Sequence, residues 1–170
     1  MLSNLLTNLQ IDINATLAEA LCSFSLNKQS EIPWLVRLLE NPKSPLALPG
    51  NIDLFGHDCL HLLLGRGISA ADEAFVIGFT MGNDTKTNGL HILIFKVFVQ
   101  FLYPVNYRFS ASHWEIFNQS FILGRQLKIR NLHRFDFNLV LDKTMAEMRS
   151  LLGIDLEEIE QSIALCASEN

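Results

Sequence analysis

Apolar residues recur every three or four positions along most of the chain, a spacing that predicts amphipathic helices. The predicted helices cover residues 2–10, 14–25, 31–40, 52–64, 69–81, 90–103, 112–129 and 136–152, and a last helix has the sequence LEEIEQSIALCA. Residues 41–51 contain three prolines and a glycine and are the clearest loop. Since we find no repeat and no linker, we expect residues 1–170 to form one all-α domain, a multi-helix bundle.

Short sequence signals mark where several of these helices begin and end. Pro33 falls in a first helical turn, where proline is tolerated, while Gly65 and Gly153 are typical of a helix C-terminus. Three helices are expected to begin with a capping pair, a short polar residue and an acid three positions later: Ser69–Asp72, Ser112–Glu115 and Asp155–Glu158.

The longest apolar run, residues 90–105, fits more than one structure. Its β-branched and aromatic residues suit a strand, but Lys96 and Gln100 lie four apart and would form one polar stripe on a helix. With no partner strand evident elsewhere, we assign a helix. His91, Lys96 and Gln100 interrupt the run, which leaves it short of the roughly 18 to 20 apolar residues that a membrane span needs.

Composition and charge narrow the class of partner. Hydrophobic residues make up 49% of the chain and 12 residues are phenylalanine, so we expect an unusually hydrocarbon-like interior. The net charge of −5 argues against a nucleic-acid partner. Residues 124–134 form either a solvated helix face or a patch for anionic lipid head groups or phosphate. This segment carries four cations and no acid: Arg125, Lys128, Arg130 and Arg134.

Cysteine usage and the first residues bear on localisation. Cys22, Cys59 and Cys166 are odd in number and share no CxxC spacing, which is typical of reduced, buried thiols. No Lys or Arg precedes Lys28, so the beginning of the chain lacks the basic residues of a signal peptide or transit peptide. We expect a cytoplasmic protein, with peripheral contact to a membrane as a further expectation.

Four ionisable side chains stand out in an apolar part of the sequence. His57 and His61 are four apart and share one helix face, and Asp58 is three before His61. Glu73 belongs to the next helix, which the turn at Gly65–Gly67 would fold back against the first. Two imidazoles and two carboxylates in this pattern predict a divalent-metal site. Alternatively, these side chains only hydrogen-bond each other within the core.

The same residues carry a resemblance. The pattern H-D-x-x-H, eleven residues, then E runs from His57 to Glu73, and it resembles the signature of the coenzyme Q (ubiquinone) biosynthesis protein 4 family. LHLLLG at 60–65, Gly-Arg at 124–125 and DKTMAEMRSLLGI at 142–154 are similar to the family as well, over about residues 30–154. The plain NIDLFG before the motif departs from the family, as does Phe137-Asn138 in place of a Trp-Glu pair, which would make the chain a divergent member.

The resemblance implies an all-α homodimer that binds a divalent metal and handles polyprenylated quinone precursors beside a membrane. Its metal ligands would be His57, Asp58, His61 and Glu73, with zinc the first choice of ion and magnesium close behind. The family has been linked to removal of the ring C1 carboxyl group, which would make the chain a metal-dependent lyase of quinone biosynthesis. It has also been regarded as a non-catalytic organiser of partner enzymes, so both interpretations stay open.

A polyprenyl ligand would need a hydrophobic cavity between helices. Ala70, Ala74, Gly78 and Gly82 recur every four residues, which allows either the close approach of another helix or a slot for an isoprenoid chain. Besides Gly78 and Gly82, the predicted lipid-binding residues are Phe75, Phe79, Phe95, Phe98 and Phe101. Arg66 and Arg125 are the cations predicted to bind the head group, which would be a phosphate, carboxylate or phenolate.

A rival enzyme class shares the adjacent His-Asp pair. Metal phosphohydrolases of the HD type need a histidine ligand upstream of that pair. The first histidine of this chain is His57 itself, so this remains a remote alternative.

Overall fold

The computed structural model describes residues 2–27, 49–101 and 108–168, so the helix predicted at 31–40 and most of the loop at 41–51 lie outside the described residues. The described parts contain seven α-helices and no β-strand, which confirms the all-α prediction. The helices are α1 (Leu17–Asn27), α3 (Leu54–Leu63), α4 (Ala70–Asn83), α5 (Gly89–Phe101), α6 (Ala111–Gln126), α7 (Met145–Leu152) and α8 (Leu156–Ser168). Three 3-10 helices accompany them: η1 (Leu2–Leu5), η3 (Leu132–Arg134) and η4 (Phe137–Val140).

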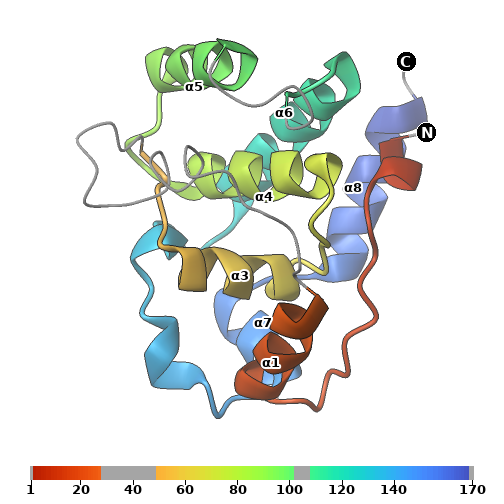
Figure 1. Cartoon of the computed structure of the whole chain (residues 1–170), viewed down its shortest axis with the longest axis vertical. Coiled ribbons are helices and arrows are strands. Elements are labelled where there is room, and N and C mark those ends of the chain that lie inside the picture. The colour runs from red at the N-terminus through yellow and green to blue at the C-terminus, as the bar shows by residue number, and fades with distance from the viewer. Residues whose placement is uncertain (1, 28–48, 102–107, 169–170) are drawn as a thin grey trace.

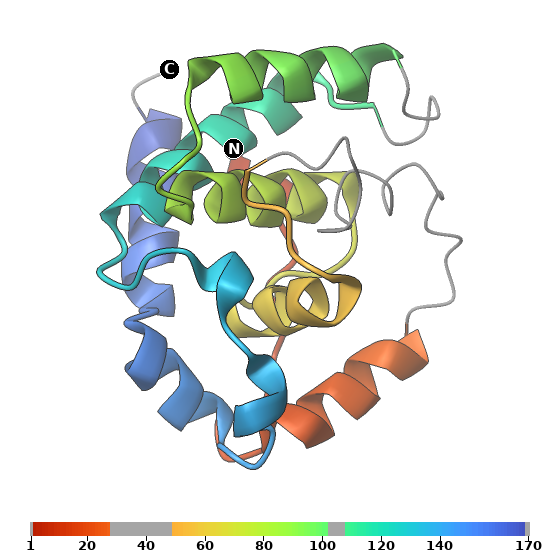
Figure 2. The same cartoon turned by 90° about the vertical axis from the view of Figure 1, so that its left-hand side faces the viewer.

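Helix α4 occupies the middle of the molecule (Figures 1 and 2). Along the longest axis, α5 lies at one end, α3 follows beyond α4, and α1 and α7 lie at the other end. Near the beginning of the chain, η1 lies beside α8, and the segment that follows η1 runs past α8 and α3 on its way to α1. Helix α4 is therefore covered by α6 on one side and faces α3 on another.

Glycines let α4 and α6 approach backbone to backbone. A Cβ atom on Gly78 would lie 2.5 Å from the carbonyl oxygen of Phe117. One on Gly82 would run into the carbonyl oxygen of Phe121, and one on Gly124 into that of Phe79. Of the two alternatives for the small-residue stripe, the structure therefore shows the close approach of another helix at Gly78 and Gly82.

Most of the predicted helix ends are confirmed. Ser69 and Asp72 form a full capping box at the start of α4. Gly65 and Gly153 have φ angles of 66° and 71°, the left-handed conformation that favours glycine after a helix. Asp155 accepts hydrogen bonds from the backbone N–H groups of residues 157 and 158, at 2.9 and 3.2 Å. The ambiguous run at residues 90–103 is helical over the part described as α5.

Three local predictions are wrong. The helix predicted at 2–10 is a 3-10 turn that ends at Leu5, because the next residues bond to another part of the chain. The helix predicted at 136–152 is divided into η4 and α7, since Thr144 caps a new helix start and pairs with Thr16 in a short bridge. Helix α6 begins after Ser110, whose capping partner is His113, rather than at the predicted Ser112–Glu115 pair.

Among the described residues, no helix combines the length and the apolar character needed to cross a membrane.

Candidate metal centre

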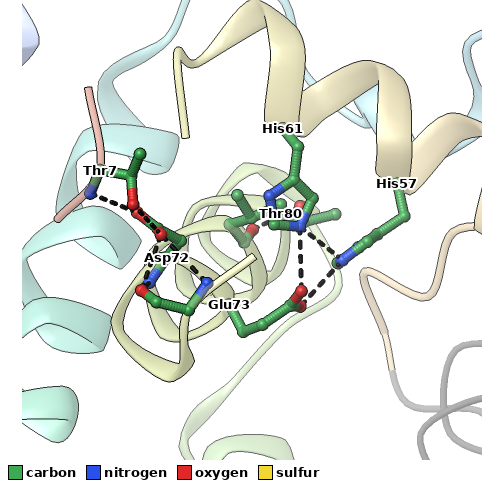
Figure 3. A network of polar contacts seen from close by, with 8 residues as sticks. Thr7, His57, His61, Asp72, Glu73 and Thr80 are labelled. Atoms are coloured by element: carbon green, nitrogen blue, oxygen red, sulfur yellow. Dashed lines mark hydrogen bonds and ion pairs between the residues drawn. The ribbon is translucent and has the colours of Figure 1, made fainter. Parts of the chain in front are cut away.

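Three side chains from two helices converge on one point between α3 and α4 (Figure 3). The Nε2 atoms of His57 and His61 are 2.9 Å apart. Glu73 places Oε2 at 3.1 Å from His57 Nε2 and Oε1 at 3.4 Å from His61 Nε2. In the part of the chain that the structure describes, this is the group of three or more His, Cys, Asp or Glu side chains whose ligand atoms could hold a metal ion.

Local structure at both helices brings these side chains together. Asp53 caps the start of α3 by accepting a 2.7 Å hydrogen bond from the Gly56 N–H. Arg149 of α7 donates to the carbonyl oxygens of Leu62 and Leu63 at the other end of α3. The turn that follows reverses the chain, and the capping box at Ser69 sets the first turn of α4, in which Glu73 lies. Four-residue spacing then stacks His57 and His61 toward it.

The centre is closed on the histidine side and open on the glutamate side. His61 is fully buried and stacks on Phe24, with ring centroids 5.9 Å apart. His57 is also buried and meets the His61 ring edge-on. The Glu73 side chain keeps 25% of its surface exposed, so a small ligand or water would approach from that direction.

Electrostatics keep the Glu73 carboxylate ionised. Burial alone would raise the pKa of Glu73, but the charge of His61 and hydrogen bonds from His57 and His61 outweigh it and hold that pKa well below its ordinary value. A carboxylate and two imidazole nitrogens that face each other form an electron-rich point. Protons shared within the cluster can neutralise it, and so can a cation.

The donor set fits a divalent ion of zinc type. Zinc binds imidazole nitrogen at about 2.0–2.1 Å in a tetrahedral shell, so two ligand atoms of one ion lie roughly 3.3 Å apart. The two imidazole nitrogens are 2.9 Å apart, and each of them has one carboxylate oxygen of Glu73 near that spacing, Oε2 at 3.1 Å from His57 and Oε1 at 3.4 Å from His61. Three protein ligands also leave a fourth position free, as in catalytic rather than structural zinc sites.

Asp58, the fourth predicted ligand, does not lie in this group. It is half-buried on α3, between the two histidines in sequence. Consecutive helical residues point about 100° apart, so a residue next to His57 leaves the face that His57 and His61 share. The structure thus brings together three of the four predicted ligands.

The two cations predicted at the head group have other partners. Arg66 is fully buried, donates to Glu160 of α8 at 2.7 Å, and lies over the Phe75 ring at 4.5 Å from its centroid. Arg125 donates to the Thr87 carbonyl oxygen at 3.1 Å and lies over the ring of Phe121.

The basic segment at 124–134 closes the C-terminal end of α4. Arg130 donates to the carbonyl oxygens of Gly82 and Asn83, both at 3.0 Å, and Asn83 binds the backbone of residues 129 and 132. Glu73 and Asn83 are ten residues apart on the helix, a distance of about 15 Å along its axis. Arg125 lies near that far end of α4, and its distance from Glu73 argues against a shared head group. Binding of the head group by Arg125 stays a prediction.

The predicted lipid-binding phenylalanines occupy three kinds of surroundings. Phe75 and Phe79 are fully buried in the core. Phe95 is buried among the rings of Phe109, Trp114 and Phe117, 5.4 to 6.1 Å away between centroids. Phe98 is partly buried, and Phe101 is 71% exposed. Lipid binding at these side chains stays a prediction.

Sequence reasoning treated one important residue only as a helix cap. Asp72 is fully buried and links the start of α4 to Thr7, near the beginning of the chain. The sequence signal was an acid, Asp72, directly before the candidate ligand Glu73. Its partner Thr7 is 65 positions away, and nothing in the sequence links the two residues.

None of the protein-family models, curated sequences and solved structures compared with the chain matches it.

Proposed function

We propose that the chain is a metal-binding protein whose His57–His61–Glu73 centre holds zinc and anchors the polar head group of a polyprenyl lipid. The lipid would be a prenylated quinone precursor or an isoprenoid phosphate, used in quinone or isoprenoid biosynthesis. The convergence of two imidazoles and one carboxylate within 4.8 Å carries the metal part of the proposal. With Asp58 outside the group, the donor set favours zinc over magnesium, which prefers oxygen ligands.

The lipid part has support from the outer face of α5. Leu90, Leu93, Val97 and Phe101 recur at helical spacing and are all exposed, from 48% to 71%. The other side of this helix buries Phe95 and Val99 against the core, so α5 is apolar on two faces. No Asp or Glu occurs at residues 85–114, whereas Lys86, Lys96 and Arg108 do. In a chain of net charge −5, this apolar and acid-free segment suits contact with an anionic lipid surface.

One pocket includes a predicted lipid-binding residue, Phe79 of α4, in its lining. It has a volume of about 260 Å³ and opens between α6 and the junction of α7 and α8. Its lining combines apolar and polar side chains: Phe79, Leu123, Leu127, Ile154 and Ile159, with Gln126, Lys128, Asp155 and Glu158. Ligand pockets usually hold about 300–1,000 Å³, so this one suits a short prenyl segment rather than a long chain.

Enzyme and carrier make different demands on the same centre. A bound zinc ion would supply Lewis acidity to a carboxylate or phenolate oxygen of the head group, which would serve decarboxylation. The chain itself would hold the ion through three ligands and exclude water on the side of His61 and Phe24. For an organiser of partner enzymes, the same anchoring without turnover suffices.

Native mass spectrometry of the purified protein, with and without chelator, tests the proposal. We expect the mass of one zinc ion per chain, lost on chelation, and an apolar ligand of a few hundred daltons. Turnover of a polyprenyl-hydroxybenzoate that requires metal would assign the enzyme, and retention without turnover the carrier. A metal-free mass that added zinc leaves unchanged would contradict the metal centre.

Vesicle flotation tests the α5 face separately. We expect full-length protein to float with vesicles that contain phosphatidylglycerol and to stay below with pure phosphatidylcholine. The variant Leu93→Asp should lose flotation, whereas Leu139→Asp, at a residue 78% exposed outside α5, should keep it. Equal flotation of both variants would contradict lipid contact through α5.

A further inference from the structure

Asp72, the residue directly before Glu73, is a buried charge with four hydrogen-bond donors around it. Thr7 donates its backbone N–H to Oδ1 at 2.8 Å and its hydroxyl to Oδ2 at 2.7 Å. Ser69 donates its hydroxyl and its N–H to Oδ2, at 2.7 and 3.1 Å. Hydrogen bonds to an ionised carboxylate are stronger than neutral ones, and Asp72 is fully buried. The carboxylate therefore holds two distant parts of the chain firmly together.

The segment at residues 7–9, here called the N-terminal strap, binds the α3–α4 turn at several points. Besides the Thr7–Asp72 bonds, the Leu9 N–H donates to the Gly65 carbonyl oxygen at 3.0 Å. Arg66 donates to the Thr7 carbonyl oxygen at 3.4 Å and to Glu160 at 2.7 Å. The strap and α8 thus clamp the same short turn that joins the two ligand-bearing helices, and Figure 3 shows the bonds between Thr7 and Asp72.

Glu73 directly follows the residue that this clamp holds. It lies in the first turn of α4, where a helix frays most easily, and no ligand of the centre lies further along α4. The two histidines lie on α3, so the angle and height of the first turn of α4 set the distance from the carboxylate to both imidazoles. A shift of about 1 Å there would separate Glu73 from one or both of them, since the present contacts are 3.1 and 3.4 Å.

We propose that Asp72, held by Thr7 of the N-terminal strap, is a positioning residue that sets Glu73 against His57 and His61 for metal binding. The inference rests on the metal centre proposed above and extends it, because it makes metal affinity depend on a segment more than sixty residues away. Asp72 lies outside the ligand group, and its hydrogen bonds within the described parts of the chain go to Thr7 and Ser69.

The test measures zinc affinity by competition with a chromophoric chelator, and coordination by the visible absorption of the cobalt-substituted protein. We expect Asp72→Asn to weaken zinc binding about tenfold, within the range for residues that orient metal ligands. Thr7→Val removes one donor but keeps the N–H bond, so its loss should be smaller, about threefold. In both variants we expect weaker cobalt absorption, because the carboxylate no longer holds the ion in a compact four-coordinate shell.

Thr144→Ala is the matched control for lost stability. The Thr144 hydroxyl donates to the Glu147 carboxylate, as the Thr7 hydroxyl does to that of Asp72, and it caps α7 by accepting from the Glu147 N–H. Its removal should cost about 1 kcal/mol of folding free energy. We expect it to lower the melting temperature while zinc affinity and the cobalt spectrum stay at wild-type values. All variants are measured as full-length chains well below their melting temperatures.

The outcomes separate the two proposals. If wild-type protein binds neither zinc nor cobalt, the metal centre is contradicted and the inference falls with it. If wild type binds both metals and the two strap variants match it, the inference alone is overturned. If Asp72→Asn does not fold, Thr7→Val still decides, since wild-type affinity and spectrum in that variant would overturn the inference.

Discussion

Helix α4 meets its two neighbours in opposite ways. Against α6 it offers Gly78 and Gly82, and the backbones come so close that a single added carbon atom would run into a carbonyl oxygen. Against α3 it offers Glu73, whose carboxylate meets two imidazoles across a gap bridged by polar atoms. One side is filled by main chain, and the other is held apart by side chains that could share an ion.

Helix α4 therefore has one face that fixes its position in the core and another face that carries the candidate metal centre. The α6 side fixes α4 through contacts that tolerate no change in size, as expected of a close-packed interior. The α3 side leaves exchangeable contacts, in which protons or a cation can occupy the space between three ligand atoms. A rigid interface on one face is what allows a precise but open arrangement on the other.

The largest expected effect is on the rate at which Cys59 of α3 is alkylated, which tests how well the α3 side of the comparison excludes water. Cys59 lies between His57 and His61 in sequence and is fully buried, and burial raises its pKa to about 12. Cys22 is exposed. We expect iodoacetamide at pH 8 to modify Cys59 about 1,000-fold more slowly than Cys22, because so little of its thiolate forms. Peptide mass mapping assigns each site, and similar rates would mean that water reaches the α3 side.

The second-largest expected effect is on stability, and it tests the interface between α4 and α6. Gly82→Ala should destabilise the protein by about 3 kcal/mol, because the new methyl group meets the backbone of Phe121 rather than a flexible side chain. Chemical denaturation measures the change. Gly89→Ala is the matched control, since a Cβ there meets nothing within 4 Å, and it should leave stability unchanged or slightly raised. Equal behaviour of the two variants would contradict the close approach.

The smallest expected effect is on zinc affinity, and it tests the polar contact between α3 and α4. Glu73→Gln keeps the shape and removes the charge, so zinc affinity should fall at least about tenfold while the helical circular dichroism stays intact. Asp58→Asn is the control on the same motif, and we expect less than a threefold change, because Asp58 lies outside the ligand group. Calorimetric titration with zinc measures both. A larger loss in Asp58→Asn than in Glu73→Gln would restore Asp58 as a ligand.

Local signals in the sequence predicted most helices, because caps and apolar spacing act within a few residues. The exceptions lie where distant bonds compete with the local pattern. Leucines at positions 2, 5, 6 and 9 have helical spacing, yet the Leu9 N–H bonds to Gly65 instead of to its own turn. Thr144 interrupts another apolar pattern by starting α7 while it pairs with Thr16.

The candidate metal centre, like the helices, could be predicted where local spacing determines it. His57 and His61 follow from four-residue spacing alone, and the turn after Gly65 made Glu73 a reasonable partner. Asp58 was assigned to the site because it lies three residues before His61, but the turn of about 100° between consecutive helical residues takes it off the face that His57 and His61 share. The glycine stripe suited two interpretations, because the residues that fill it come from α6, about 40 positions further along the chain.

The clamp on the α3–α4 turn has a consequence for the order of folding. The bonds from Thr7 to Asp72 and from Arg66 to Glu160 join residues 65 and 94 positions apart, whereas α4 and α6 are neighbours within about 40. Closing a longer loop costs more chain entropy, so we expect the α4–α6 pair to form early and the clamp late. On a ribosome, a chain could not complete this clamp until Glu160 had been synthesised, and metal capture would belong to the last stage of its maturation.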